Sequence, residues 1–252
     1  MILTERTKSL ASVRTRFAIA DGGANWETFS IFGGSTASTL ANLAGFPNGV
    51  PSTLVGAPTI GTAGVTVSGT NALQIEQMPD AGSETIYLVV DPGAATPTNG
   101  ADLFSNWNGD YTSCTLLTAG AGFFGIYANV AFLDSGATPR AIGSQLANSY
   151  TSATGNPTYS GPQCFVIRID MAAMLITVKN LTRPNQLTTY PIPAGYTRPA
   201  STKKYRLGGY KSTTGTSIVY AFGKRSGAST DAQDALMYGQ FQANLAVLGI
   251  TI

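Results

Sequence analysis

The sequence predicts an all-β protein: an antiparallel sandwich of two sheets, followed by one C-terminal helix. From about residue 58 onward, short runs of β-branched and aromatic residues recur between turns rich in Gly, Pro and Asn. The runs 64–68 and 72–76 alternate apolar and polar residues, as strands with one solvated face do. Many short strands joined by turns indicate a sandwich and not a parallel sheet with crossover helices.

The run 85–90 is continuously β-branched or aromatic, which predicts a central strand buried on both faces. The runs 163–170 and 174–179 are expected to pair across a tight connection, and Phe165, Ile167 and Ile169 share one face of the first. The remaining strands are expected at 64–68, 72–76, 103–105, 114–117, 123–128, 130–133, 204–208 and 217–222.

The C-terminal segment has a helical pattern. Thr230 followed by Gln233 forms a capping box. Gly249 ends the helix, and 250–252 are expected to return as a short strand. An apolar stripe at helical spacing is expected to pack on the core, and it consists of Met237, Phe241, Leu245 and Leu248.

The N-terminal part differs from the rest. Residues 1–16 carry a charged arm or a short helix, and 21–60 run through Gly and Pro turns without sustained periodicity. We therefore divide the chain into an N-terminal attachment arm, 1–56, mostly irregular, and a domain, 57–252. The irregular stretch is expected to wrap another surface, such as another subunit.

The composition excludes several classes of function. The chain has no His among its 252 residues, which removes His-based triads, general bases and metal ligands. Two cysteines, Cys114 and Cys164, are too few for a structural zinc site. We expect them as buried free thiols in a chain made in a reducing cytoplasm, and a disulfide between them stays open. No apolar run is long enough to span a bilayer, so no membrane insertion is expected.

Charge is sparse and unevenly placed. Only 11% of residues are charged, against about 25% in typical domains. Residues 17–139 contain nine acids and no Lys or Arg, whereas 140–252 contain eleven basic residues and three acids. Either acidic and basic faces of successive copies meet, or the two halves neutralise each other within one sandwich. We expect no nucleic-acid partner, because the only compact basic cluster is small: Lys203, Lys204, Arg206 and Lys211.

Three stretches resemble a concanavalin A-like, laminin-G-like jelly-roll domain of the kind found in bacteriophage virion proteins such as tail fibres, baseplates and decorations. The resemblance covers about three quarters of the chain, 57–252. The stretches are 71–75 with 83–90, then 165–170 with 175–180, and finally 205–209 and 218–223 with the acid-capped helix start at 229–234.

The resemblance implies a non-enzymatic virion structural protein, tail- or fibre-associated, made in the host cytoplasm. Its implied partners are other virion proteins, copies of itself in a homotrimer, and a host-surface glycan bound by the lectin-like domain. One alternative is a capsid decoration or collar protein without a host ligand. A second is a glycan-degrading enzyme of the same fold, because fold alone does not fix function.

The best binding candidate is a turn-rich loop that places aromatic rings beside amide and carboxylate groups. Sugars stack an apolar face on Trp or Tyr and bond their hydroxyls to Asn or Asp. The alternative is an Asn-Gly hairpin turn with Trp107 packed at the core edge. We expect no catalytic residue, since no strand carries acids at alternate positions, and no metal, since no dense cluster of Asp and Asn is present. No cofactor is expected. The candidate residues are Asn106, Trp107, Asn108, Asp110 and Tyr111.

Overall fold

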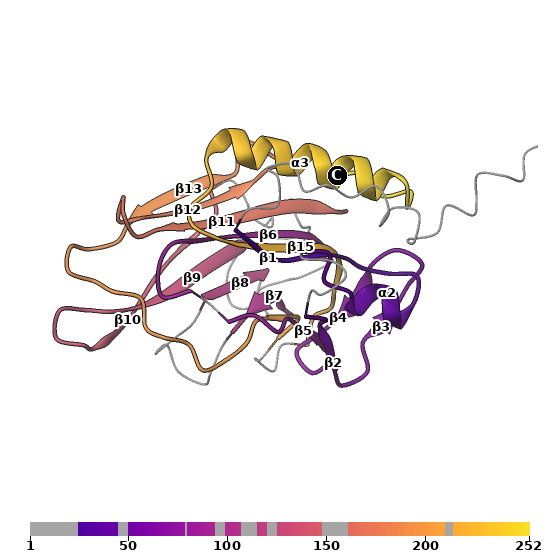
Figure 1. Cartoon of the computed structure of the whole chain (residues 1–252), viewed down its shortest axis with the longest axis horizontal. Helices are drawn as coiled ribbons and strands as arrows, with labels where there is room; N and C mark the ends of the chain where they lie inside the picture. Colours follow the sequence, from indigo (N-terminus) through magenta and orange to yellow (C-terminus); the bar gives the residue numbers. More distant parts are fainter. Residues whose placement is uncertain are drawn as a thin grey trace, which may run out of the picture.

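The computed structural model describes residues 25–44, 50–78, 80–93, 99–106, 115–119, 125–147, 161–209 and 214–252. Within these ranges the chain forms an antiparallel jelly-roll sandwich of two sheets, with a long helix, α3, lying on one of them (Figure 1). The predicted fold class is confirmed: two antiparallel sheets and one C-terminal helix.

The first sheet, sheet A, has eight strands in the order β13-β12-β11-β6-β15-β4-β3, and β1 pairs with β15 beside β4. Its strands are β1 (Trp26–Ile31), β3 (Thr59–Ile60), β4 (Val65–Val67), β6 (Glu84–Asp91), β11 (Gln163–Asp170), β12 (Leu175–Asn180), β13 (Leu187–Pro191) and β15 (Ser217–Ser226).

The second sheet, sheet B, has seven strands in the order β10-β9-β8-β7-β14-β5-β2. Its strands are β2 (Thr53–Val55), β5 (Ala72–Gln74), β7 (Ala101–Ser105), β8 (Thr115–Ala119), β9 (Ile126–Leu133), β10 (Pro139–Gln145) and β14 (Arg206–Leu207). A short helix, α2 (Thr36–Leu40), follows β1, and α3 (Asp231–Ala246) ends the fold.

Strand β6 is buried on both faces, as its continuous apolar run predicted. It lies between β11 and β15, and only its last residue is not fully buried. Ile86, Leu88 and Val90 face the main core between the two sheets, while Tyr87 and Val89 face a second core under α3. The predicted hairpin of β11 and β12 is also confirmed, with Ile169 opposite Ile176.

The expectation that 21–60 lacks regular structure is wrong for its described part. β1 pairs with β15 and β2 pairs with β5, so this part of the chain is built into both sheets. The register of β1 shifts between Trp26 and Thr28, and this bulge places Trp26 and Phe29, three residues apart, in the same core. The alternation that signals a strand is therefore interrupted. Residues 1–24 lie outside the described ranges, and the division at residue 56 stays a prediction.

Trp26 reaches its place because β15 carries Gly223 opposite β1. A Cβ at Gly223 would lie 2.8 Å from the Trp26 ring, so only glycine permits this close packing. Trp26 then contacts Phe29 edge-on at 5.8 Å and Tyr87 at 5.7 Å between ring centroids. Phe29 stacks on Phe241 of α3 at 5.2 Å, which joins β1 to the helix.

The helix has the predicted ends. Thr230 and Gln233 form the capping box, and Gly249 has a φ of 78° after the last turn. Met237, Phe241 and Leu245 are buried against sheet A, and Leu248 packs at their edge. The expected strand at 250–252 is absent from the structure. The N–H of Ile250 instead donates to the carbonyl of Leu245, and Ile250 and Ile252 pack beside the helix.

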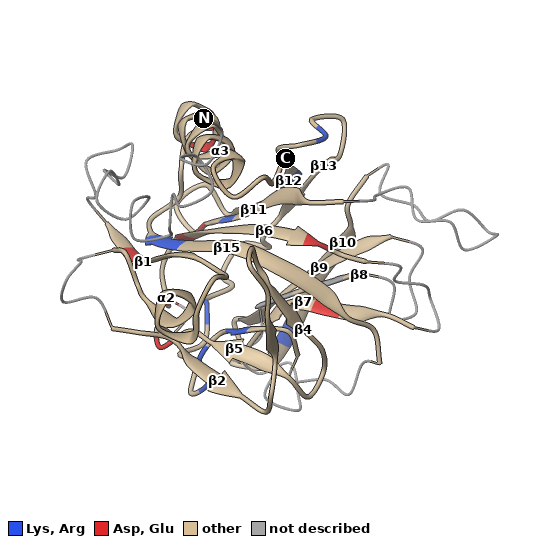
Figure 2. Cartoon of the chain, turned by 90° about the vertical axis from the view of Figure 1, so that its right-hand side faces the viewer, with Lys and Arg blue, Asp and Glu red and all other residues tan. Residues whose placement is uncertain are grey.

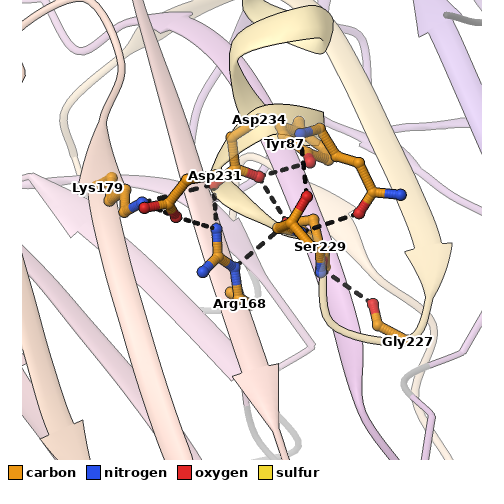
Figure 3. A network of polar contacts seen from close by, with 10 residues as sticks. Tyr87, Arg168, Lys179, Gly227, Ser229, Asp231 and Asp234 are labelled. Atoms are coloured by element: carbon orange, nitrogen blue, oxygen red, sulfur yellow. Dashed lines mark hydrogen bonds and ion pairs between the residues drawn. The ribbon is translucent and has the colours of Figure 1, made fainter. Parts of the chain in front are cut away.

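A polar network fixes the start of α3 on sheet A (Figure 3). The buried carboxylate of Asp234 accepts hydrogen bonds from the Tyr87 hydroxyl at 2.7 Å and from Ser229 at 2.5 Å. Arg168 of β11 donates to the other oxygen of Asp234 and also to Asp231, at 2.9 Å. Lys179 binds Asp231 as well, and these two cations lower the pKa of Asp231 to about 2. Asp234 therefore joins the helix to β6 and β11.

Replacing Asp234 by Ala should lower the free energy of unfolding by about 3–5 kcal/mol, because Arg168 and the Tyr87 hydroxyl would lose their buried acceptor. Replacing Asp231 by Ala removes the same charge from a side chain that is 78% exposed, and should cost less than about 1 kcal/mol. Urea unfolding of both variants measures the difference. Equal losses would show that Asp234 does not hold the helix.

Candidate functional site

Asn106 is the one residue of the predicted binding loop that the structure describes. It follows β7 directly and is buried, and its side-chain amide donates to the Ser201 hydroxyl at 2.9 Å. Ser201 in turn bonds the backbone of Lys203, so Asn106 joins the end of β7 to the loop before β14. The other predicted residues, Trp107, Asn108, Asp110 and Tyr111, lie outside the described residues, and their role stays a prediction.

A polar row crosses the outer face of sheet B next to Asn106. The strand register places Thr53, Gln74, Arg206 and Ser105 side by side, and beyond Leu116 of β8 the row continues with Asn129 and Gly143, on the face opposite the core residues Leu73, Leu207 and Phe104. Neither described helix lies on this face, since α3 covers sheet A and α2 contacts β1 (Figure 1). Ser105 and Asn129 are buried on this face, so the accessible polar part of the row lies at Thr53, Gln74 and Arg206.

Four side chains around Glu76 form a connected cluster at the exposed end of this row, which we call the Glu76 cluster: Thr53, Gln74, Lys204 and Arg206. Thr53 and Gln74 donate to one oxygen of Glu76 at 3.1 and 3.3 Å, and Lys204 binds the other. Burial opposes ionisation of Glu76, but these hydrogen bonds outweigh it and lower its pKa. Arg206 donates to Gln74 at 3.4 Å, so donors and acceptors from three strands lie together.

Farther along the face, Tyr127 and Asn129 offer an aromatic ring and an amide. The Tyr127 hydroxyl lies 2.7 Å from where a Cβ of Gly143 would stand, so the glycine leaves room for this side chain on the face. Asn129 is 5% exposed, and its side-chain oxygen has no hydrogen-bond partner within the described ranges. The amide oxygen of Asn129 is therefore closed to a ligand, and of these two residues Tyr127 is the more accessible.

The sequence analysis did not select these residues. A usable signal was present, because Gln74 and Glu76 alternate with the core residues Leu73 and Ile75 and so mark the outward face of β5. The partners of Glu76 come from residues 53, 204 and 206, and only the folded sheet brings them together.

A second cluster lies at one end of the main core, and we call it the Lys224 cluster. Lys224 is fully buried and binds Glu27 at 2.7 Å, Asp80 at 3.1 Å and Glu84 at 3.6 Å. Glu84 is fully buried too. It also accepts hydrogen bonds from Arg198 and from the Tyr205 hydroxyl, each at 2.7 Å. In Figure 2 the basic end of β15 lies beside the acidic position of β1.

Glu84 and Glu27, two carboxylates of the Lys224 cluster, have pKa values shifted in opposite directions. Burial opposes ionisation of Glu84, but the charges of Arg198 and Lys224 outweigh it and lower its pKa. Burial raises the pKa of Glu27, and the neighbouring Asp80 adds to the rise although Lys224 opposes it. No carboxylate pair could be predicted from the sequence, because Glu27 and Asp80 are far apart along the chain and meet only in the folded structure, around Lys224.

Ion pairs within the chain explain the uneven charge distribution. Residues 17–139 contribute Glu27, Glu76, Asp80, Glu84 and Asp134 to ion pairs, each with a base from 140–252. The structure therefore supports the interpretation that the acidic and basic parts of the sequence neutralise each other within one sandwich.

The part of the chain that the structure describes was also compared with what a metal site, a membrane-spanning helix or a reactive cysteine requires. No group of three or more Cys, Asp or Glu side chains there is arranged to hold a metal ion. None of its helices is long and apolar enough to cross a membrane. Cys164 is a buried free thiol, as expected, and burial raises its pKa well above the usual value. Cys114 lies outside the described residues.

Comparison with known proteins finds structures of similar fold but identifies no family for this chain. No protein-family model matches the chain, and no curated protein matches its sequence. Solved structures do match. The binding domain of botulinum neurotoxin serotype D has a TM-score of 0.62 at 10% identity, covering 89% of this chain and 53% of that one.

Two further structures are similar to the same extent. The binding domain of botulinum neurotoxin DC, in complex with SialylT, has a TM-score of 0.62 at 10% identity, covering 87% of this chain and 52% of that one. The binding domain of Paraclostridial Mosquitocidal Protein 1 has a TM-score of 0.60 at 9% identity, covering 88% and 52%. The chain spans about half the length of these structures, and at such identities the likeness shows the jelly-roll fold alone.

Replacing Lys224 by Met should lower the free energy of unfolding by about 3–5 kcal/mol at pH 7, because three carboxylates would lose their buried cation. The loss should shrink near pH 4, where protonated carboxyls no longer need a counter-charge. Lys204→Met is the matched control. Its side chain is 36% exposed, so its loss should stay below about 1 kcal/mol. Urea unfolding at both pH values tests this, and a loss independent of pH would contradict it.

Proposed function

We propose that this chain is a non-enzymatic binding module of a bacteriophage virion, tail- or fibre-associated, that binds a host-surface glycan through the outer face of sheet B. The observation that carries the proposal is the Glu76 cluster. It places amide, guanidinium, ammonium, hydroxyl and carboxylate groups on the sheet face that neither described helix covers.

The predicted loop adjoins this cluster through Asn106. Ser105 and Arg206 are register partners, so the chain leaves β7 beside Arg206 and enters the segment that carries Trp107 and Tyr111. Sugars require hydrogen bonds to their hydroxyls, which the Glu76 cluster offers, and stacking on an apolar ring face, which we expect of Trp107 and Tyr111. The similar structures include a binding domain in complex with SialylT, which agrees with this ligand class.

The virion role rests on the resemblance of 57–252 to phage lectin-like domains. With it we propose that the chain assembles with other virion proteins and with copies of itself as a homotrimer, using 1–56 for attachment. A capsid decoration or collar protein without a host ligand is the main alternative, and it differs from our proposal in its place on the particle and in lacking the glycan.

A second candidate function, glycan hydrolysis, is favoured by one observation. Glu27 and Asp80 both accept hydrogen bonds from the Lys224 ammonium, at 2.7 and 3.1 Å, so two carboxyls lie near each other, as in a glycosidase. We do not prefer it, because both carboxyls are engaged by the buried Lys224 ammonium. The Oε2 atom of Glu27 and the Oδ2 atom of Asp80 both form ion pairs with Lys224 at the end of the main core.

On a glycan array, the chain should bind a defined subset of glycans, and both Trp107→Ala and Arg206→Ala should weaken that binding at least about tenfold. The reason is that each removes a stacking ring or a charged hydrogen-bond donor, worth about 1.5–3 kcal/mol. Arg140→Ala is the matched control, because it removes an exposed arginine, 55% accessible, at the far edge of the same sheet.

The control variant should bind within about twofold of the parent chain, a difference well under about 1.4 kcal/mol. If folded Trp107→Ala binds as the parent does, the loop is not part of the site. If the parent binds no glycan and no intact host cell while joining particles, the decoration or collar alternative is correct.

Incubation with polysaccharide should release no reducing sugar, because the paired carboxyls are neutralised by Lys224. Release that is abolished by both Glu27→Gln and Asp80→Asn would establish the hydrolase instead. Release that survives both substitutions would point to a contaminating enzyme. The Glu27→Gln variant, purified in the same way as the parent chain, is the control for such contamination.

A further inference from the structure

The outer edge of sheet B is formed by β10, and part of its backbone has no partner within the described residues. The N–H of Asp134 donates to Thr138 at 3.0 Å, and the N–H of Leu146 donates to Ile126 at 2.8 Å, at the two ends of the β9–β10 pair. Bonded pairs alternate along antiparallel strands. Arg140, Ile142 and Ser144 therefore turn their backbone groups toward β9, whereas Ala141 and Gly143 turn theirs away from the sheet.

The open stretch has defined limits. Pro139 has no N–H to offer, and the carbonyl of Gln145 already accepts from the Thr188 hydroxyl at 3.1 Å. Between them, Ala141 and Gly143 are exposed, and no backbone hydrogen bond joins them to another described residue on that side. An exposed strand edge of this kind is a template for pairing with another chain.

The other sheet edges are shorter or covered. β3 and β2 have two and three residues, and β13 has five and ends in Pro191. The free side of β1 is occupied, because the Phe29 N–H donates to the Asn42 side chain at 3.0 Å and the Phe29 carbonyl accepts from Leu43. With seven residues in unbroken register, β10 is the longest edge left open in the described part of the chain.

We propose that two copies of this chain pair through β10, antiparallel about a two-fold axis at Ile142, so that their B sheets become continuous. In this arrangement Ala141 of each copy stands opposite Gly143 of the other. The two N–H and two carbonyl groups of each copy then form four hydrogen bonds across the axis. The small side chains of these two residues leave the strands free to approach.

A second copy fits this edge because the open stretch is self-complementary in length and charge. A pair centred on Ile142 covers 139–145 on both sides and leaves no overhang. Arg140, the only charged residue of β10, stands opposite Ser144 of the other copy and already pairs with Asp134 of its own chain at 2.9 Å. No like charges meet, and the net charge of +2 opposes association little. The contact is independent of the proposed glycan site and of any contact made by 1–56.

Sedimentation equilibrium of the full chain over a wide concentration range tests the proposal. Whether the associating unit is a single chain or a trimer formed through 1–56, it should associate reversibly through β10, and Ala141→Lys should raise the dissociation constant of this step at least tenfold, because it places two lysines beside the axis. Ser135→Lys is the matched control, since it adds the same charge at an exposed position of the same hairpin. It should leave the dissociation constant within about twofold, a small free-energy change.

Mild oxidation of an Ile142→Cys variant supplies a second readout. Residue 142 of each copy lies on the axis in a non-hydrogen-bonded pair, where the two Cα atoms approach to about 4.5 Å, close enough for a disulfide. We expect a cross-linked dimer from this variant and none from the parent chain. A chain that stays monomeric, a self-association that Ala141→Lys does not change, or the absence of the cross-link would each overturn the proposal.

Discussion

The structure depends on the need to bury both faces of β6. Its residues alternate between the main core, through Ile86, Leu88 and Val90, and the second core, through Tyr87 and Val89. Sheet A must therefore be covered twice, by sheet B on one face and on the other by α3, under which Trp26 and Phe29 of β1 help to fill the second core. The outer face of sheet B is mixed: apolar residues such as Tyr127 and Ala131 lie there beside polar ones, and neither described helix covers it. Its accessible polar groups lie around Glu76, where β2, β5 and β14 meet.

Buried charges join these layers at two places. Asp234 connects α3 to β6 and β11 through Tyr87 and Arg168, and Lys224 connects β15 to β1 through Glu27. Each cation or carboxylate is held by several partners, so its removal leaves uncompensated charge in the interior. This arrangement also accounts for the uneven sequence: the acids of the first half and the bases of the second half are partners within one fold. The same pairing explains why close carboxylates do not by themselves argue for catalysis.

The interior strands and the helix could be predicted from continuous or alternating apolar patterns, although 126–133, expected as parts of two strands, forms the single strand β9. Strands β2, β3, β10 and β13, which are the four ends of the two sheets, were missed. An end strand is buried on one side at most, so a sequence such as that of β10, with Pro139, Arg140 and Gly143, lacks the apolar pattern. β1 was missed because its bulge interrupts the alternation. Of the site, Asn106 and its loop were selected from composition, whereas the Glu76 cluster required the register of three strands.

The most direct test of the account is hydrogen–deuterium exchange of the full chain with and without the glycan that binds it best on the array. The account predicts slower exchange in β2, β5, β14 and the segment after β7, and no change in α3. Protection confined to α3 and the Lys224 cluster would contradict it, because ligand would then bind where the fold has placed its internal supports.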